Sequence, residues 1–158
     1  TGVILGAWMW SEIGHCALQA GHLESANELF RKALDEQTAP MWLMRPSALA
    51  GLTELALRDD RVEDAEELFE QRRDYVNERK MADYYIDVEV LGARLSARKG
   101  DFDAALRSLT RTEAITRNAG LLRLLFDVHI LQGQVHAMRG DDEAEARSNA
   151  AARAVGGA

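Results

Sequence analysis

The ten residues Gly100–Leu109 read GDFDAALRSL, and two other stretches of the chain repeat their pattern. GHLESANELF occupies Gly21–Phe30, and DRVEDAEELF occupies Asp60–Phe69. Each stretch begins with Gly or Asp, has Ala five residues later, and has a large apolar residue four residues after that Ala. A pattern that occurs three times in 158 residues indicates that one structural unit is repeated along the chain.

The starting positions of these stretches are evenly spaced. Positions 21, 60 and 100 are followed by Gly140, so the period is about 40 residues, within the range of about 20–50 that is typical of solenoid proteins. Ala, Leu, Glu and Arg abound while Val and Ile are sparse, which favours helices over a sheet. The sequence predicts a single domain over residues 1–158, with units at about 4–36, 46–78, 82–117 and 121–154.

Each unit divides into two helical stretches. The first helices are predicted at 4–20, 46–59, 82–99 and 121–139, and the second helices at 22–36, 61–78, 101–117 and 141–154. Glycine at 21, 100 and 140 can adopt the left-handed conformation that ends a helix, and Asp60 tolerates it at moderate cost. Asp101 and Asp141 are suited to cap the helix that follows. So tight a turn folds the two helices into an antiparallel hairpin.

Small residues recur where the two helices of a hairpin face each other. Gly14, Thr53, Ala93 and Gly133 lie seven residues before the turns, and Ala26, Ala65 and Ala105 lie five residues after them. Small side chains let helix axes approach to about 8–10 Å. The larger Phe30, Phe69 and Leu109 can then reach the neighbouring hairpin. The predicted fold is all-α, a right-handed α-solenoid of about four antiparallel helix pairs.

Charge and composition exclude several classes of function. The formal net charge is −7, which argues against direct binding to nucleic acid. The longest apolar run, residues 3–10, is too short to span a bilayer, so no membrane partner is expected. The single cysteine, Cys16, favours a reducing, cytoplasmic setting and is expected to be buried. Because the chain begins with Thr1 inside a helical pattern, we expect it to be a piece of a larger multidomain protein.

The repeat resembles the tetratricopeptide (TPR) repeat. The first unit has the consensus spacing at Trp10, Ile13, Gly14, Ala17, Gly21, Ala26, Phe30 and Ala33, whereas later units depart from it at Arg72, Gln132, Glu145 and Asn149. The long period is similar to that of the sensor regions of MalT-type LuxR regulators. The resemblance implies a bacterial scaffold that binds a protein, a peptide or a small effector, or contacts neighbouring domains of its parent chain. No phosphate-binding loop or helix-turn-helix is visible.

In the TPR family the first helix of each pair lines a concave groove. The corresponding positions here are Trp8, Ser11, His15, Gln19, Ala50, Glu54, Leu57, Arg58, Asp87, Val90, Arg94, Arg98, Asp127, Ile130, Gln134 and Met138. The resemblance implies binding roles for Trp8, His15, Glu54, Arg58, Arg94, Arg98 and Gln134. Arg94 and Arg98 lie four residues apart on one helix face, where their guanidinium groups could grip carboxylates. The alternative is that they pair with Glu54, Asp87 or solvent.

The segment APMWLMRP, residues 39–46, falls in the predicted connection between the first two units. Met41, Trp42, Leu43 and Met44 would form an adaptable contact loop if they were exposed. Alternatively, this loop folds its apolar side chains over the helix ends. Trp8 and Trp10 are expected either to bind a partner or to pack against a preceding repeat.

The residues that could carry catalysis or hold a metal do not combine. His129 and His136 lie about 10.5 Å apart along a helix, too far for one metal ion. Glu12 and His15 form a single E-x-x-H, and adjacent helix residues such as His15 and Cys16 point in different directions. We therefore expect no enzyme activity, no cofactor and no metal. The alternative to a binding scaffold is a self-association module that forms a homodimer.

Overall fold

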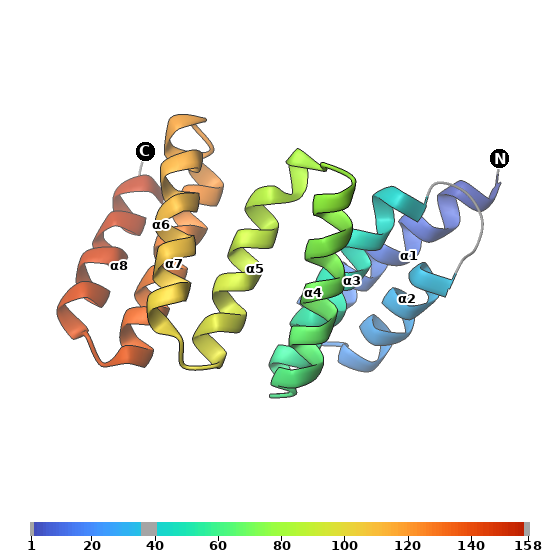
Figure 1. Cartoon of the computed structure of the whole chain (residues 1–158), viewed down its shortest axis with the longest axis horizontal. Helices are drawn as coiled ribbons and strands as arrows, with labels where there is room; N and C mark the ends of the chain where they lie inside the picture. Colours follow the sequence, from blue (N-terminus) through green and yellow to red (C-terminus); the bar gives the residue numbers. More distant parts are fainter. Residues whose placement is uncertain (1, 36–40, 157–158) are drawn as a thin grey trace. The chain divides into compact units, whose positions relative to one another are not determined.

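The computed structural model describes the backbone of residues 2–35 and 41–156, and the side chains of residues 9–35 and 44–156. Within these residues the chain is all-α, with eight α-helices, one 3-10 turn and no strand (Figure 1). The helices are α1 (Gly2–Gln19), α2 (Leu23–Asp35), α3 (Met41–Arg58), α4 (Val62–Glu78), α5 (Tyr85–Arg98), α6 (Phe102–Asn118), α7 (Leu122–Arg139) and α8 (Asp142–Gly156), and the 3-10 turn is η1 (Ala82–Tyr84). None of the helices in these residues combines the length and apolar character needed to cross a membrane.

The chain divides into two compact units, Thr1–Tyr85 and Ile86–Ala158. In the first unit, α1 packs against α2 and α3, and α4 packs against α3 (Figure 1). In the second unit, α7 packs against both α6 and α8. Of the predicted pairs, α1 packs with α2, α3 with α4 and α7 with α8. The helix boundaries lie within a few residues of those expected except at the start of α3.

The turns between helices are built on residues with positive φ. Gly21, Gly100 and Gly140 have φ of 80–82°, and Asp60 has φ of 58°, as the sequence predicts. The structure adds Lys80 (φ 52°) and Gly120 (φ 69°), so that these residues are evenly spaced from position 60 to position 140.

One pattern of backbone hydrogen bonds closes each of these turns. After α5, the Gly100 N–H donates to the carbonyl of Ala97 (3.1 Å) and the Asp101 N–H donates to that of Ser96 (2.9 Å). The same pair of bonds follows α1, α3, α4, α6 and α7, and it is the Schellman motif that satisfies the last carbonyls of a helix. Capping of the next helix is confirmed at two positions, because Asp101 and Asp141 accept from the N–H of Ala104 and Ala144, both at 3.0 Å.

The core of the first unit is built around Phe30. Its ring is fully buried among α1, α2 and α3. A Cβ atom at Gly14 of α1 would lie 2.7 Å from this ring, and one at Gly51 of α3 would lie 2.2 Å from it. The predicted role of Gly14 as a site of close helix approach is confirmed, and so is the reach of Phe30 to the next hairpin. Gly51 is a second such site that the repeat pattern did not reveal.

The core of the second unit joins α5, α6 and α7. Ala93, Ala105 and Leu109 are at most 1 % exposed and pack with Val128 and Val135 of α7. Gly133 lies against α8, where a Cβ would come within 2.7 Å of the Asn149 Oδ1 atom. Gly14, Gly51 and Gly133 thus lie where a residue of a neighbouring helix leaves no room for an added side chain.

Two sequence-based expectations are wrong. Residues 41–44 begin α3 instead of forming a contact loop, because Pro46 lies in the second turn of the helix, where its missing N–H removes one hydrogen bond without ending the helix. Cys16 is exposed, since it lies on the α1 face turned away from Phe30. Trp10 packs against the core of its own unit, and its ring lies 3.6 Å from the Lys32 Nζ atom, while its contact with a partner or a preceding repeat stays a prediction.

Candidate functional site

A pocket of about 360 Å³ lies between α5 and α7 in the second unit. Six of its lining residues are groove positions that the TPR resemblance singled out: Asp87, Val90 and Arg94 on α5, and Asp127, Ile130 and Gln134 on α7. The others are Ile86, Leu124, Phe126, Val128 and Leu131. Arg98 and Met138, which the same resemblance implied, do not line the pocket.

The polar residues of the pocket occupy matching positions of the repeat. Asp87 and Asp127 are one repeat period apart, and so are Val90 and Ile130, and Arg94 and Gln134. Along the two helices, Val90 and Ile130 therefore lie between the carboxylates of Asp87 and Asp127 on one side and the guanidinium of Arg94 and the amide of Gln134 on the other. A small number of polar groups on a mainly apolar wall is the usual composition of a ligand pocket.

Polar interactions already occupy part of this wall. Asp127 pairs with Arg123 at 3.7 Å, but the Arg123 side chain is 90 % exposed, so this pair contributes little, about 0–1 kcal/mol. Asp87, Arg94 and Arg98 also take part in polar interactions. The pairing of these arginines with Glu54, Asp87 or solvent and the contact of Arg94 with a ligand both stay predictions.

Two candidate groove residues of the first unit, Glu54 and Arg58, make contacts within the protein. Arg58 pairs with Glu54 at 3.5 Å and donates from Nη1 to the Leu18 carbonyl at 3.2 Å, which links α3 to the end of α1. A cation there also complements the dipole of α1. The side chain of Trp8 lies outside the described residues, as do those of Met41, Trp42 and Leu43. Met44 is half-buried.

His15 belongs to a hydrogen-bonded chain between α1 and α3. The Ser11 hydroxyl donates to Ser47 Oγ (2.9 Å), and His15 Nε2 lies 3.0 Å from the same oxygen. The imidazole also packs edge-on against Phe30, with ring centroids 4.8 Å apart. Burial lowers the pKa of His15 below its usual value, and the attraction of Glu12 opposes this shift only in part. These contacts hold the half-buried His15 between α1 and α3.

Arg72 is a buried cation at a position where the TPR resemblance predicts a small residue. Its side chain is 2 % exposed, and Nε donates to the Pro46 carbonyl at 2.9 Å. The ring of Tyr84 lies 6.0 Å from the guanidinium carbon. Arg72 thereby ties α4 to the second turn of α3.

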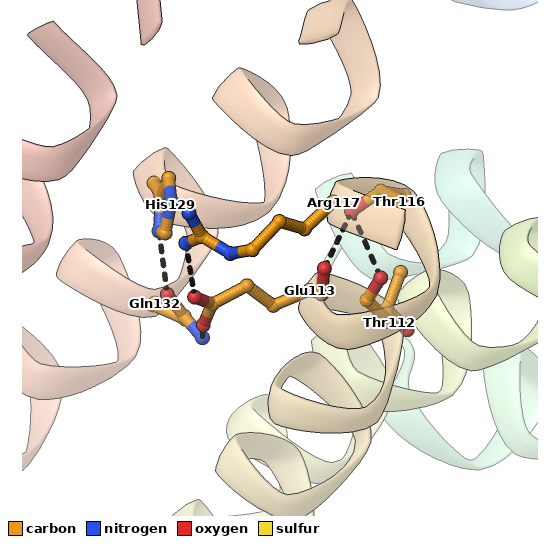
Figure 2. Close-up of polar contacts among 6 residues, drawn as sticks. All are labelled: Thr112, Glu113, Thr116, Arg117, His129 and Gln132. Atoms are coloured by element: carbon orange, nitrogen blue, oxygen red, sulfur yellow. Dashed lines mark hydrogen bonds and ion pairs between the residues drawn. The ribbon is translucent and has the colours of Figure 1, made fainter. Parts of the chain in front are cut away.

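A polar network holds α6 against α7 (Figure 2). Gln132 lies 3.0 Å from His129 Nδ1 through Oε1, and its Nε2 donates to Glu113 Oε2 at 3.0 Å. Arg117 donates to the other oxygen of Glu113 at 2.7 Å. Thr112 and Thr116 are fully buried beside it and bond to carbonyls of their own helix. The only sequence signal for this network was Gln132 at a core position of the repeat.

The network favours the ionised form of Glu113. Partial burial alone would raise the pKa of this carboxyl, but hydrogen bonds from Gln132 and Arg117 outweigh burial and hold the pKa below its usual value. Because His129 and Gln132 face α6 while Asp127, Ile130 and Gln134 line the pocket, the network holds the opposite side of the pocket wall. It links α7 to α6 through the bond between Gln132 and Glu113.

Comparison with known proteins gives no relative from which a function could be transferred. No family model, no curated protein and no solved structure matches the chain.

Proposed function

We propose that the protein is a binding module: an α-solenoid of TPR type whose first helices form a recognition surface, with the α5–α7 pocket as its ligand site. The observation that carries this proposal is the coincidence of two independent features. The groove positions inferred from the repeat, Asp87, Val90, Arg94, Asp127, Ile130 and Gln134, are the polar and central residues of the pocket.

The wider context of the proposal is signalling. In this role the module is the sensor or interaction region of a cytoplasmic, multidomain bacterial regulator of the MalT-type LuxR kind. It holds a protein, peptide or small effector and passes the effect to neighbouring domains. The repeat period, which is longer than that of the usual TPR unit, supports this role. The module is proposed to have no catalytic activity of its own.

A ligand screen with a pocket-filling variant tests the site. The probes are free amino acids, mono- to trisaccharides, nucleotides, and libraries of free-ended tripeptides and end-capped hexapeptides, and binding is followed by protein NMR. Val90→Phe fills the pocket, whereas Ile115→Phe adds the same ring on an α6 position that lies outside the pocket lining and is 38 % exposed. We expect at least one probe class to bind the wild type and Ile115→Phe but not Val90→Phe. The absence of any probe with this dependence would contradict the site.

An exposed apolar group favours self-association as a second candidate function. Ile115, Leu121 and Leu122 are 38 %, 40 % and 54 % exposed around the turn between α6 and α7. Light scattering over a concentration series tests this candidate. A dimer that Leu121→Ser/Leu122→Ser dissociates would support it, and a wild-type monomer at all concentrations would exclude it.

A further inference from the structure

The pocket between α5 and α7 has chemically distinct ends. Asp87 and Asp127 supply carboxylates at one end, and Arg94 and Gln134 supply N–H donors at the other. Val90 and Ile130 occupy the level between them and present only hydrocarbon. The second unit carries equal numbers of acidic and basic side chains. The arrangement of charges within the pocket, and not the net charge of the unit, therefore selects a ligand.

Each end favours one kind of ligand group. Two carboxylates on facing helices favour an ammonium group, which has only donors to offer. A guanidinium beside an amide favours a carboxylate, because charge-assisted N–H bonds to carboxylates are the stronger kind. The pocket is thus complementary to a molecule that is cationic at one end, anionic at the other and apolar between.

The distance between the ends sets the length of that molecule. Asp87 and Arg94 are seven residues apart on one helix, which corresponds to about 10.5 Å along its axis. An extended peptide advances about 3.3–3.6 Å per residue, so three residues with free termini span about the same distance. The volume of about 360 Å³ lies near the lower end of the range for ligand pockets, which also favours a small molecule.

We propose that the α5–α7 pocket binds a short apolar peptide of about three residues in extended form, with its free ammonium at Asp87 and Asp127 and its free carboxylate at Arg94 and Gln134. This inference rests on the proposed function of the pocket as a ligand site. Asp87 and Arg94 have polar interactions in the protein alone, and Asp127 has Arg123, so the ligand termini share or replace these partners. The middle side chain of the peptide packs on Val90 and Ile130.

The test crosses three ligands with three variants of the full chain. The ligands are alanyl-leucyl-alanine with free ends, its N-acetyl form and its C-terminal amide, and the dissociation constants come from NMR titration. The variants are Asp87→Asn/Asp127→Asn, Arg94→Gln, and the control Arg98→Gln. Arg98 is one turn from Arg94 and does not line the pocket.

The expected outcome is a specific pairing of ligand and variant. The wild type binds the N-acetyl peptide about tenfold more weakly than the free peptide. The variant Asp87→Asn/Asp127→Asn binds the free peptide about tenfold more weakly than the wild type does, but it binds the N-acetyl peptide as the wild type does. Arg94→Gln likewise weakens binding of the free peptide about tenfold without weakening binding of the C-terminal amide. Arg98→Gln leaves all three dissociation constants unchanged. Losses that do not depend on which terminus is blocked would overturn the proposed orientation.

The failure of this inference can be told from the failure of the proposed function. If free-ended tripeptides do not bind while another probe class binds and is excluded by Val90→Phe, the peptide inference is wrong and the ligand site remains. If no probe class shows this dependence on Val90, both are wrong. If the peptide binds Val90→Phe as well as the wild type, it binds elsewhere and the inference is again wrong.

Discussion

Replacing Gly51 by Ala is expected to destabilise the first unit, although the same change usually stabilises a helix. In the interior of a helix, Ala is more favourable than Gly by about 1 kcal/mol. At Gly51 the added Cβ would lie 2.2–2.5 Å from three carbon atoms of the Phe30 ring. Carbon atoms at an optimal contact are about 3.5–4.0 Å apart, so α2 or α3 must move by about 1 Å.

The magnitude follows from these two opposing effects. Overpacking of a core costs about 1–3 kcal/mol and occasionally more, and this contact is close enough for the upper end of that range. After the gain in helix propensity is subtracted, we expect a net loss of about 1–2 kcal/mol. Gly133→Ala is the matched control, because its Cβ meets the Asn149 side-chain oxygen at 2.7 Å, and a side-chain end can rotate away. That variant should be neutral or stabilising, by up to the gain in helix propensity of about 1 kcal/mol.

Urea unfolding followed by tryptophan fluorescence measures this effect in the correct unit. All three tryptophans, at 8, 10 and 42, lie in the first unit, so fluorescence reports on that unit and circular dichroism on both. In a Phe30→Leu background, the smaller side chain should relieve the contact and Gly51→Ala should cost less. An equal cost in both backgrounds, or a stabilisation in the wild type, would refute the packing argument.

Four further predictions concern turns, ionisation and packing. Lys80→Gly should stabilise the first unit by about 0.5–1 kcal/mol in urea unfolding, because φ of 52° strains a residue with a side chain, and an unchanged midpoint would contradict this. The lowered pKa of His15 means that the folded first unit favours the neutral imidazole, so its contribution to stability is complete above about pH 6.5 and is lost as the pH falls below that value. Urea unfolding followed by fluorescence should show this loss in the wild type and not in His15→Gln. The stability that ionised Glu113 gives the second unit is complete above about pH 4.5 and is lost as the pH falls further; circular dichroism should show a weaker acid dependence in Glu113→Gln. Ala105→Arg should destabilise the second unit by about 3 kcal/mol or more, because Ala105 is fully buried. The control Ser108→Arg, at a half-buried position, should cost under about 1 kcal/mol. Equal losses of stability for the two variants, measured by circular dichroism, would contradict the assigned helix faces.

The turns show what local sequence can predict. Gly21, Gly100 and Gly140 predict helix ends at a residue in the left-handed conformation, because few residues other than glycine adopt positive φ at low cost. Lys80 carries no such signal, and the structure alone shows that it takes the same conformation. The start of α3 differs from the expected connection at residues 39–46 for a related reason, because one proline in the second turn, Pro46, removes only one hydrogen bond.

The candidate site was predictable only in part. The repeat period predicted that Asp87 and Asp127, and likewise Arg94 and Gln134, occupy equivalent positions on first helices. Whether a void remains between α5 and α7 depends on side-chain volumes on both helices, which the spacing of residues does not specify. The network of Glu113, Gln132 and His129 was not predicted, because it pairs residues from different helices and only the placement of one polar residue in the core hinted at it.

The residues with positive φ at 60, 80, 100, 120 and 140 also determine where the chain can change length. One α-helix lies between each pair of neighbouring residues in this set, and we call these turn residues the stops. A single residue inserted within a helix would rotate everything between the insertion and the next stop by about 100°, and the apolar stripe would face solvent. An insertion at a stop, as beside the exposed Gly120, would leave every helical face in place. Length variants of this protein should therefore differ at the stops or by whole helix pairs.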